Sequence, residues 1–116
     1  MFVTLKLNVN LQVGTIVCHD TNNTWRQALS TDIAPLGVIE KVTTDDDGNF
    51  WGRVRMAGSA LARAGSASMA AEGGWLAVDD SGRAIIGASE DCGLVAPRSQ
   101  GQSAPAIDDL ILVYIR

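Results

Sequence analysis

The chain places Gly14-Thr15-Ile16-Val17 ahead of Asp20, six residues after the glycine, and then continues to Pro35-Leu36-Gly37-Val38-Ile39. Later it repeats that order with Gly74-Trp75-Leu76-Ala77, Asp80 at the same offset of six, and Asp91-Cys92-Gly93-Leu94-Val95. Each copy is followed by an alternating segment, 51–56 in the first and 110–115 in the second. Because internal repetition fixes the architecture of a chain, this pattern predicts two related β-units that form one barrel or sandwich with rough two-fold pseudosymmetry.

Length and composition predict a single β domain over residues 1–116. A chain of 116 residues is too short to give two domains a core each. The hydrophobic fraction of 47% comes mainly from Ala, Val, Leu and Ile, because the chain has only three Trp, two Phe and one Tyr. We therefore expect a thin, aliphatic core.

Short alternating or β-branched runs, separated by Gly, Asp, Asn and Pro turns, are typical of small barrels and sandwiches. Such runs occupy 2–9, 14–18, 25–29, 37–43, 50–56, 75–78, 83–86, 93–96 and 109–116. The run at 14–18 and the run at 109–116 are apolar on both sides, which predicts strands covered on both faces. The sequence thus predicts a mainly β fold, a small barrel or β-tulip with about nine short strands.

Residues 58–74 consist almost entirely of Ala, Ser and Gly. Alanine favours helix, but Gly58 and Gly65 each cost about 1 kcal/mol against alanine in a helix interior. We expect a loop packed along the barrel with at most one short helical turn. Residues 97–106 are expected to form a polar connection.

The charge balance disfavours two classes of partner. A formal net charge of -4 and a pI of about 4.7 argue against nucleic acid and against an anionic membrane surface, since both need clustered cations. No run approaches the roughly 20 apolar residues that span a bilayer. The N-terminus alternates where a signal peptide would be continuously apolar, so a cytosol-like compartment is expected.

Two cysteines, Cys18 and Cys92, lie far apart and lack the pairing of a zinc site. Their pattern favours two free, largely buried thiols. A disulfide between them is the alternative.

Catalytic and cofactor motifs are not evident. His19 is the only histidine, and Cys18 beside it points to the opposite face of a strand, which is the wrong geometry for a nucleophile pair. A surface histidine in a turn is the simpler interpretation. Glycine-rich phosphate-binding fingerprints are absent, so we expect no enzyme activity and no cofactor.

The acidic turns have a similarly plain interpretation. Asp45-Asp46-Asp47-Gly48-Asn49 resembles a calcium loop, but an EF-hand closes with a glutamate at position twelve, where this chain has Met56. A hairpin tip is therefore expected there, and likewise at Asp79-Asp80-Ser81-Gly82. No metal site is predicted.

Two groups of side chains leave alternatives open. Trp25, Trp51 and Trp75 are expected to anchor packing, and a sugar-binding platform is the alternative. Arg53 and Arg55 share one strand face, where they could pair with acidic groups of a neighbouring subunit or simply be solvated.

Several segments have the order and spacing of one known family. They are the turn glycine and strand at 14–17, the segment 35–39, the alternating strand Arg53-Val54-Arg55-Met56 ending at Gly58, the basic residue and small-residue run Arg63-Ala64-Gly65-Ser66-Ala67, the glycine turn, strand and aspartate of 73–79, the segment 92–95 and the apolar C-terminal strand. Together they resemble the small capsid decoration, or cement, proteins of tailed bacteriophages and prophages. Two features depart from that family: the strand pattern starts at Phe2 where relatives often have a flexible arm, and the basic residue that follows a proline is represented by Arg63 after Ala62.

The resemblance implies a β-tulip or barrel-like subunit that forms homotrimers on the outer surface of a capsid, after synthesis in the host cytoplasm. Its partners would be the major capsid protein and further copies of itself, with Arg53, Arg55 and Arg63 as candidate interface residues. The implied function is to stabilise the shell by bridging capsomers. The alternatives are a tail-tube or head-fibre component, a carbohydrate-binding β module, and a small β-barrel hydrolase that uses His19.

Overall fold

The computed structural model describes residues 2–20, 23–32, 36–65, 72–86, 94–98 and 106–115. These residues form ten strands and no helix, which confirms the expected all-β class. The strands are β1 (Phe2–Leu7), β2 (Ile16–His19), β3 (Thr24–Gln27), β4 (Leu36–Thr44), β5 (Phe50–Arg55), β6 (Gly58–Arg63), β7 (Glu72–Val78), β8 (Ala84–Ile86), β9 (Leu94–Arg98) and β10 (Leu110–Ile115).

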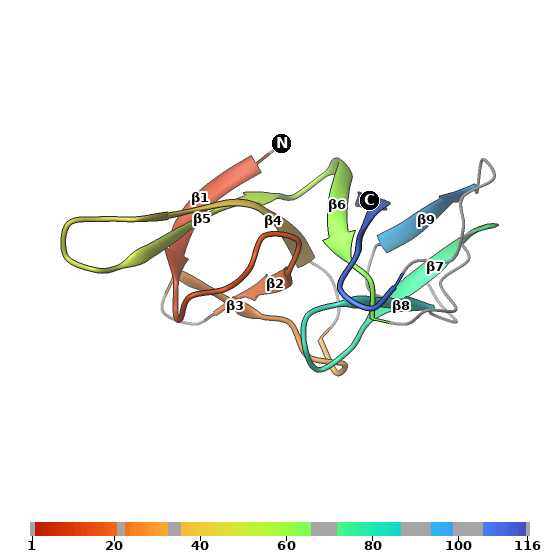
Figure 1. Ribbon diagram of the computed structural model, residues 1–116, viewed down its shortest axis with the longest axis horizontal. Coiled ribbons are helices and arrows are strands. Elements are labelled where there is room, and N and C mark those ends of the chain that lie inside the picture. Colours follow the sequence, from red (N-terminus) through yellow and green to blue (C-terminus); the bar gives the residue numbers. More distant parts are fainter. Residues whose placement is uncertain are drawn as a thin grey trace.

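The strands form two five-stranded units, which lie side by side along the long axis of the molecule (Figure 1). The first is a closed barrel in the order β1-β3-β2-β4-β5. The second is a sheet in the order β6-β10-β9-β7-β8, whose outer strands are joined by one parallel bridge between Ala64 and Ala84. We call β1–β5 the first repeat and β6–β10 the second repeat.

The two repeats have the same topology. Each strand pair of the barrel has a counterpart in the second repeat with the same direction, obtained by moving five strands along the chain. The registers also agree when residue numbers are shifted by 57 in β1 and β4 and by 59 in β2, β3 and β5. The internal repeat seen in the sequence is therefore present in the backbone.

Individual pairs show how close the correspondence is. The parallel pair Leu7–Trp25 of the first repeat is equivalent to the pair Ala64–Ala84 of the second. The hydrogen bond from Asn8 N to the Trp25 carbonyl (3.0 Å) likewise has its counterpart in the bond from Gly65 N to the Ala84 carbonyl (2.8 Å).

The structural alignment corrects the sequence alignment by one residue. Asp20 N donates to the Thr24 carbonyl and Asp79 N to the Arg83 carbonyl, so Asp79, and not Asp80, is the counterpart of Asp20. The turn residues Asn23 and Gly82 are equivalent, and both have positive φ, 57° and 68°. The turn geometry, which the sequence comparison did not use, fixes this alignment.

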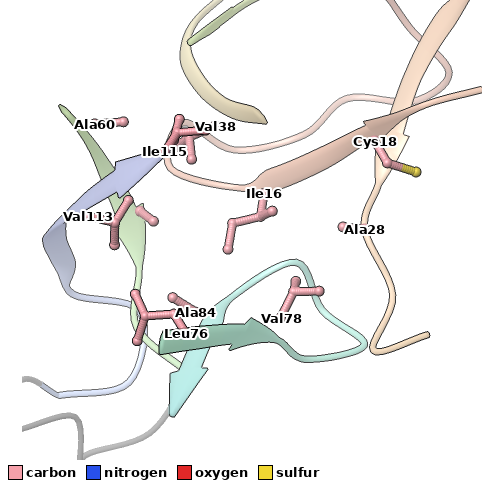
Figure 2. Close-up of a cluster of buried hydrophobic side chains, with 11 residues drawn as sticks. Ile16, Cys18, Ala28, Val38, Ala60, Leu76, Val78, Ala84, Val113 and Ile115 are labelled. Atoms are coloured by element: carbon pink, nitrogen blue, oxygen red, sulfur yellow. The ribbon is translucent and has the colours of Figure 1, made fainter. Parts of the chain in front are cut away.

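Two clusters of buried side chains form the core. One lies inside the barrel and consists of Leu7, Val17, Trp25, Ile39 and Val54. The other combines both repeats: Ile16, Cys18, Ala28 and Val38 from the first with Ala60, Ala62, Leu76, Val78, Ala84, Val113 and Ile115 from the second. Figure 2 shows Ile16 in the middle of this second cluster, where it points from β2 toward side chains of the second repeat.

Strand β2 is the wall shared by the two clusters, because its successive side chains point to opposite faces. Val17 points into the barrel, whereas Ile16 and Cys18 point into the joint cluster. All three are buried, so the prediction of a strand covered on both faces is confirmed here.

The segment 58–74 was predicted wrongly as a loop with at most one helical turn. Residues 58–63 form β6, which pairs with the full length of β10, and β7 begins at Glu72. Ala60, Ala62 and Ala64 are buried. Small side chains at these inward positions let β6 and β10 lie close to the first repeat, and this tertiary fit outweighs the helix propensity of alanine.

Two further expectations need correction. Pro97 and Arg98 belong to β9, not to the connection that was predicted to begin at 97. Strand β10 is fully covered on one face only, since Val113 and Ile115 are buried while Leu110, Leu112 and Tyr114 are exposed. Its second face is covered only in part, where Gly14 lies against the Leu110 side chain.

The turn between β7 and β8 joins the repeats. Ile16 N donates to the Gly82 carbonyl at 2.8 Å, and Gln27 Nε2 donates to the Asp80 carbonyl at 2.9 Å. A Cβ on Gly82 would lie 2.7 Å from Thr15 Cγ2 and 2.9 Å from the Ile16 carbonyl oxygen. The close approach of the two repeats therefore requires glycine at position 82.

Candidate functional site

The candidate site is a surface that begins at an irregularity in β4. The register between β4 and β5 shifts between Ile39 and Lys41, which leaves Glu40 as the bulged residue. A bulge re-aims the side chain that it carries. The Glu40 carboxylate accepts a hydrogen bond from Arg55 Nε at 2.7 Å, and Arg53 Nε lies 3.7 Å from its other oxygen.

Arg53 and Arg55 thus share one face of β5, as predicted, and Glu40 holds them together. The Arg53 guanidinium also lies over the ring of Phe2, 3.6 Å from its centroid, in a cation–π contact. The Arg53 side chain is 44% exposed, so its charge remains accessible to a partner. We call Glu40, Arg53, Arg55 and Phe2 the charged face.

An open hollow of about 300 Å³ adjoins Glu40. It lies between β4 and the β6–β10 pair, and its lining is mostly apolar: Val13, Ile39, Glu40, Ser59, Ala60, Leu61, Leu110 and Leu112. The hollow is wide enough for one large side chain of a partner protein.

Exposed apolar side chains lie on the outer face of β6 and β10. Leu61, Leu110 and Leu112 line the hollow together with Val13, and Tyr114 lies further along β10. Leu61 and Leu112 are directly opposite each other in the β6–β10 register. We call these five residues the apolar face.

Arg63, the third predicted interface residue, does not join the other two. Its guanidinium donates to Asp108 Oδ1 at 2.6 Å and to Thr15 Oγ1 at 3.2 Å, and its side chain is only 15% exposed. The bond to Arg63 holds the pKa of Asp108 below its usual range. Arg63 therefore links β6 to the turn before β2 and to the segment before β10.

Cys18 and His19 point to opposite faces of β2, as expected. His19 is exposed and stacks edge-to-face on Trp25, with ring centroids 5.6 Å apart. Cys18 is a free, buried thiol, and Cys92 lies outside the described residues. Burial, and then the nearby carboxylate of Asp32, raise the pKa of Cys18 to about 11, so the thiol is protonated and poorly nucleophilic at neutral pH.

Asp45 accepts hydrogen bonds from the backbone of the hairpin turn between β4 and β5, where a turn was predicted. Its carboxylate accepts hydrogen bonds from the backbone N–H groups of Asp47 and Asn49 and from Trp51 Nε1, each at 2.9 Å. These bonds, the one from Trp51 first, lower the pKa of Asp45. The hydrogen bonds of the Asp45 carboxylate therefore stabilise the hairpin that contains it.

The tryptophans do not form one platform. Trp25 is buried in the barrel, which confirms its role as a packing anchor, and Trp51 is fixed to the hairpin by Asp45. The side chain of Trp75 lies outside the described residues.

Within the described ranges, no group of three or more His, Cys, Asp and Glu side chains converges as metal ligands would. The same residues contain no helix of the length and apolarity needed to cross a membrane. This surface can bind a partner through apolar contacts around the hollow and through ion pairs at the charged face.

Sequence reasoning found Arg53 and Arg55 but missed Glu40 and the apolar face. The apolar residues on both faces of β10 were interpreted as burial on both sides, so its outer residues were not considered as an exposed surface. A comparison of the two repeats position by position could have shown that Leu112 stands where the first repeat has Arg53.

No protein-family model, curated protein or solved structure matches this chain.

Proposed function

We propose that this protein is a structural virion component that binds the outer surface of a tailed-phage capsid and stabilises the shell by bridging capsomers. The observation that carries the proposal is the continuous adhesive surface made by the charged face, the hollow and the apolar face. Interfaces combine an apolar centre with a polar rim and are enriched in Arg and Tyr relative to the rest of the surface, and this surface has these features. The resemblance to decoration proteins supplies the kind of partner, the major capsid protein.

The mechanism is mechanical. A closed barrel and a second sheet that share a buried core form a stiff body, so load applied at one contact is carried to the other side of the subunit. Many copies bound at once give high avidity although each contact is modest. Expansion or rupture of the shell would first have to break these contacts.

Addition of purified protein to preformed shells of the phage that encodes it tests the proposal. We expect co-sedimentation of the wild-type protein with the shells and a higher temperature of shell rupture. Arg53→Gln removes the most accessible charge of the charged face and should weaken binding about tenfold or more, since hydrogen bonds to charged groups contribute about 1.5–3 kcal/mol.

Ser81→Asp is the matched control, because it also lowers the net charge by one but lies on the exposed β7–β8 turn. It should bind as the wild type does. Binding to tails and not to shells, or equal loss of binding in both variants, would show the proposal to be wrong.

A further inference from the structure

Positive charge gathers on the outer face of the barrel strands β1, β5 and β4. Arg53 and Arg55 lie on this face of β5, and Lys41 stands directly opposite Arg53 in the β4–β5 register. Lys6 lies on β1 opposite Trp51, the residue two positions before Arg53. Both lysine side chains are exposed. We call Lys6, Lys41, Arg53 and Arg55 the basic stripe.

The basic stripe carries charge that the protein itself leaves largely unpaired. It contains both lysines of the chain and two of its arginines, on a protein whose formal net charge is -4. Among the described residues only Glu40 forms ion pairs with the stripe, and it contacts the two arginines. By contrast, Arg26, Arg63 and Arg83 each pair with an aspartate of their own. One carboxylate among four cations leaves a local excess of positive charge.

The fold does not require this concentration of charge. In the second repeat, Leu112 and Tyr114 stand at the positions of Arg53 and Arg55, although the strand pairing has the same direction and register. Like charges directly opposite each other on paired strands are destabilising, and Lys41 and Arg53 have this arrangement. Local conflicts that the fold does not need are expected at functional sites.

We propose that the basic stripe binds an extended acidic segment of a partner protein. Arginine offers paired N–H donors that match a carboxylate, and lysine adds a compact charge. Arg53 and Arg55 are about 7 Å apart along β5, which is also the spacing of every second side chain of an extended segment. The inference deepens the proposed function and rests on it only for the identity of the partner, which would be a segment of the capsid protein.

The borders of the basic stripe favour a short acidic segment over nucleic acid. Asp46 and Asp47 are exposed at the tip of the β4–β5 hairpin, and Glu40 lies beside Arg55 at the other border. A phosphate backbone carries charge along its whole length, so it would continue from the stripe onto these carboxylates and be repelled. A segment with two or three acidic side chains can end before it reaches them.

Fluorescence anisotropy with a labelled peptide of alternating Glu and Thr residues tests the inference. We expect the wild-type protein to bind this peptide more tightly than the same peptide with Gln in place of Glu, and added salt to weaken the binding, because salt screens exposed charges. Lys41→Gln and Lys6→Gln should each weaken binding about two- to fivefold, as expected for exposed ion pairs. The double variant should weaken it about tenfold.

Ser81→Asp is the matched control, because it lowers the net charge by one, as Lys41→Gln does, but lies on the exposed β7–β8 turn. It should change peptide binding by less than about twofold, since charges beyond a Debye length are largely screened. Both lysines are exposed, so neither lysine variant should lower the midpoint of thermal unfolding by more than about 3 °C. Weaker binding is then not a consequence of unfolding.

Three results would overturn the inference. They are equal affinity for the Glu and Gln peptides, equal loss of binding in Ser81→Asp and Lys41→Gln, and tighter binding of a labelled oligothymidylate than of the Glu peptide. The titration contains no shells, so its failure and the failure of shell binding are distinguishable. A protein that binds shells but not the Glu peptide contradicts only the acidic segment, and one that binds the Glu peptide but not shells contradicts only the virion role.

Discussion

At the scale of single residues, Asp32 connects the end of β3 to the joint core. Its carboxylate accepts two hydrogen bonds from the Arg26 guanidinium, at 2.8 and 3.0 Å, and one from Leu29 N at 2.8 Å. The thiol of Cys18 lies 3.6 Å from the same carboxylate. These bonds, the pair from Arg26 first, lower the pKa of Asp32 to about 2.

Acid should therefore remove the stabilisation that Asp32 provides. A carboxyl group whose pKa is lower in the folded state stabilises the protein above its unfolded value, near 3.8, and this contribution is lost as the pH falls toward 2. Asp32→Asn should lower the free energy of unfolding at pH 7 by about 1–2 kcal/mol. Urea denaturation at pH 7, 4 and 3 should show the difference from wild type narrowing below pH 4.

Asp46→Asn is the control for this prediction, because Asp46 lies exposed at the tip of the β4–β5 hairpin. It should leave the free energy of unfolding nearly unchanged at each pH. An Asp32→Asn difference that stays constant from pH 7 to pH 3 would show that the ion pair with Arg26 is not the cause.

At the scale of elements, the β7–β8 turn is a close contact between the repeats. Gly82→Ala introduces a methyl group that meets Thr15 and the Ile16 carbonyl, and it places alanine at a φ of 68°. Gly48→Ala is the matched control, since Gly48 has a φ of 82° but nothing within 4 Å of the added carbon. Backbone strain alone costs about 1 kcal/mol, so Gly48→Ala should lower the free energy of unfolding by about 1 kcal/mol. Gly82→Ala adds a clash and should lower it by about 2–4 kcal/mol. Equal losses in thermal or urea unfolding would contradict this account of the turn.

Strands with alternation or flanking turns were predictable from the sequence. The alternation of 2–9 and the Asp-rich turn at 45–49 depend on local chemistry. The structure confirms the turn, and strand β1 covers residues 2–7 of the predicted 2–9. Strand β6 was not predictable, because Gly58-Ser59-Ala60-Leu61-Ala62-Arg63 owes its conformation to pairing with β10, which lies about fifty residues away in the sequence. The bulge at Glu40 was missed for the same reason, since a bulge is a property of two paired strands. The candidate site was thus predictable only for the arginines, which share one strand.

At the scale of the whole molecule, the two repeats have one topology but unequal cores. The barrel core consists of first-repeat residues alone, and it includes Leu7 and Trp25. The equivalent positions of the second repeat are Ala64 and Ala84, which fill much less volume. The second repeat completes its core with Ile16, Cys18, Ala28 and Val38 of the first.

This asymmetry predicts that the repeats differ when they are separated. A fragment of residues 1–57 keeps the closed barrel and its own core, so we expect a dispersed amide spectrum and a cooperative, though weak, unfolding transition, as befits a domain near the lower size limit. A fragment of residues 58–116 loses the four first-repeat side chains and should remain unfolded, because burial of its alanines cannot offset the entropy of ordering the chain. Addition of the first fragment should restore dispersed signals to the second. If 58–116 folds alone while 1–57 does not, the second repeat does not depend on the barrel to fold, and the larger core around Trp25 is not what stabilises the molecule.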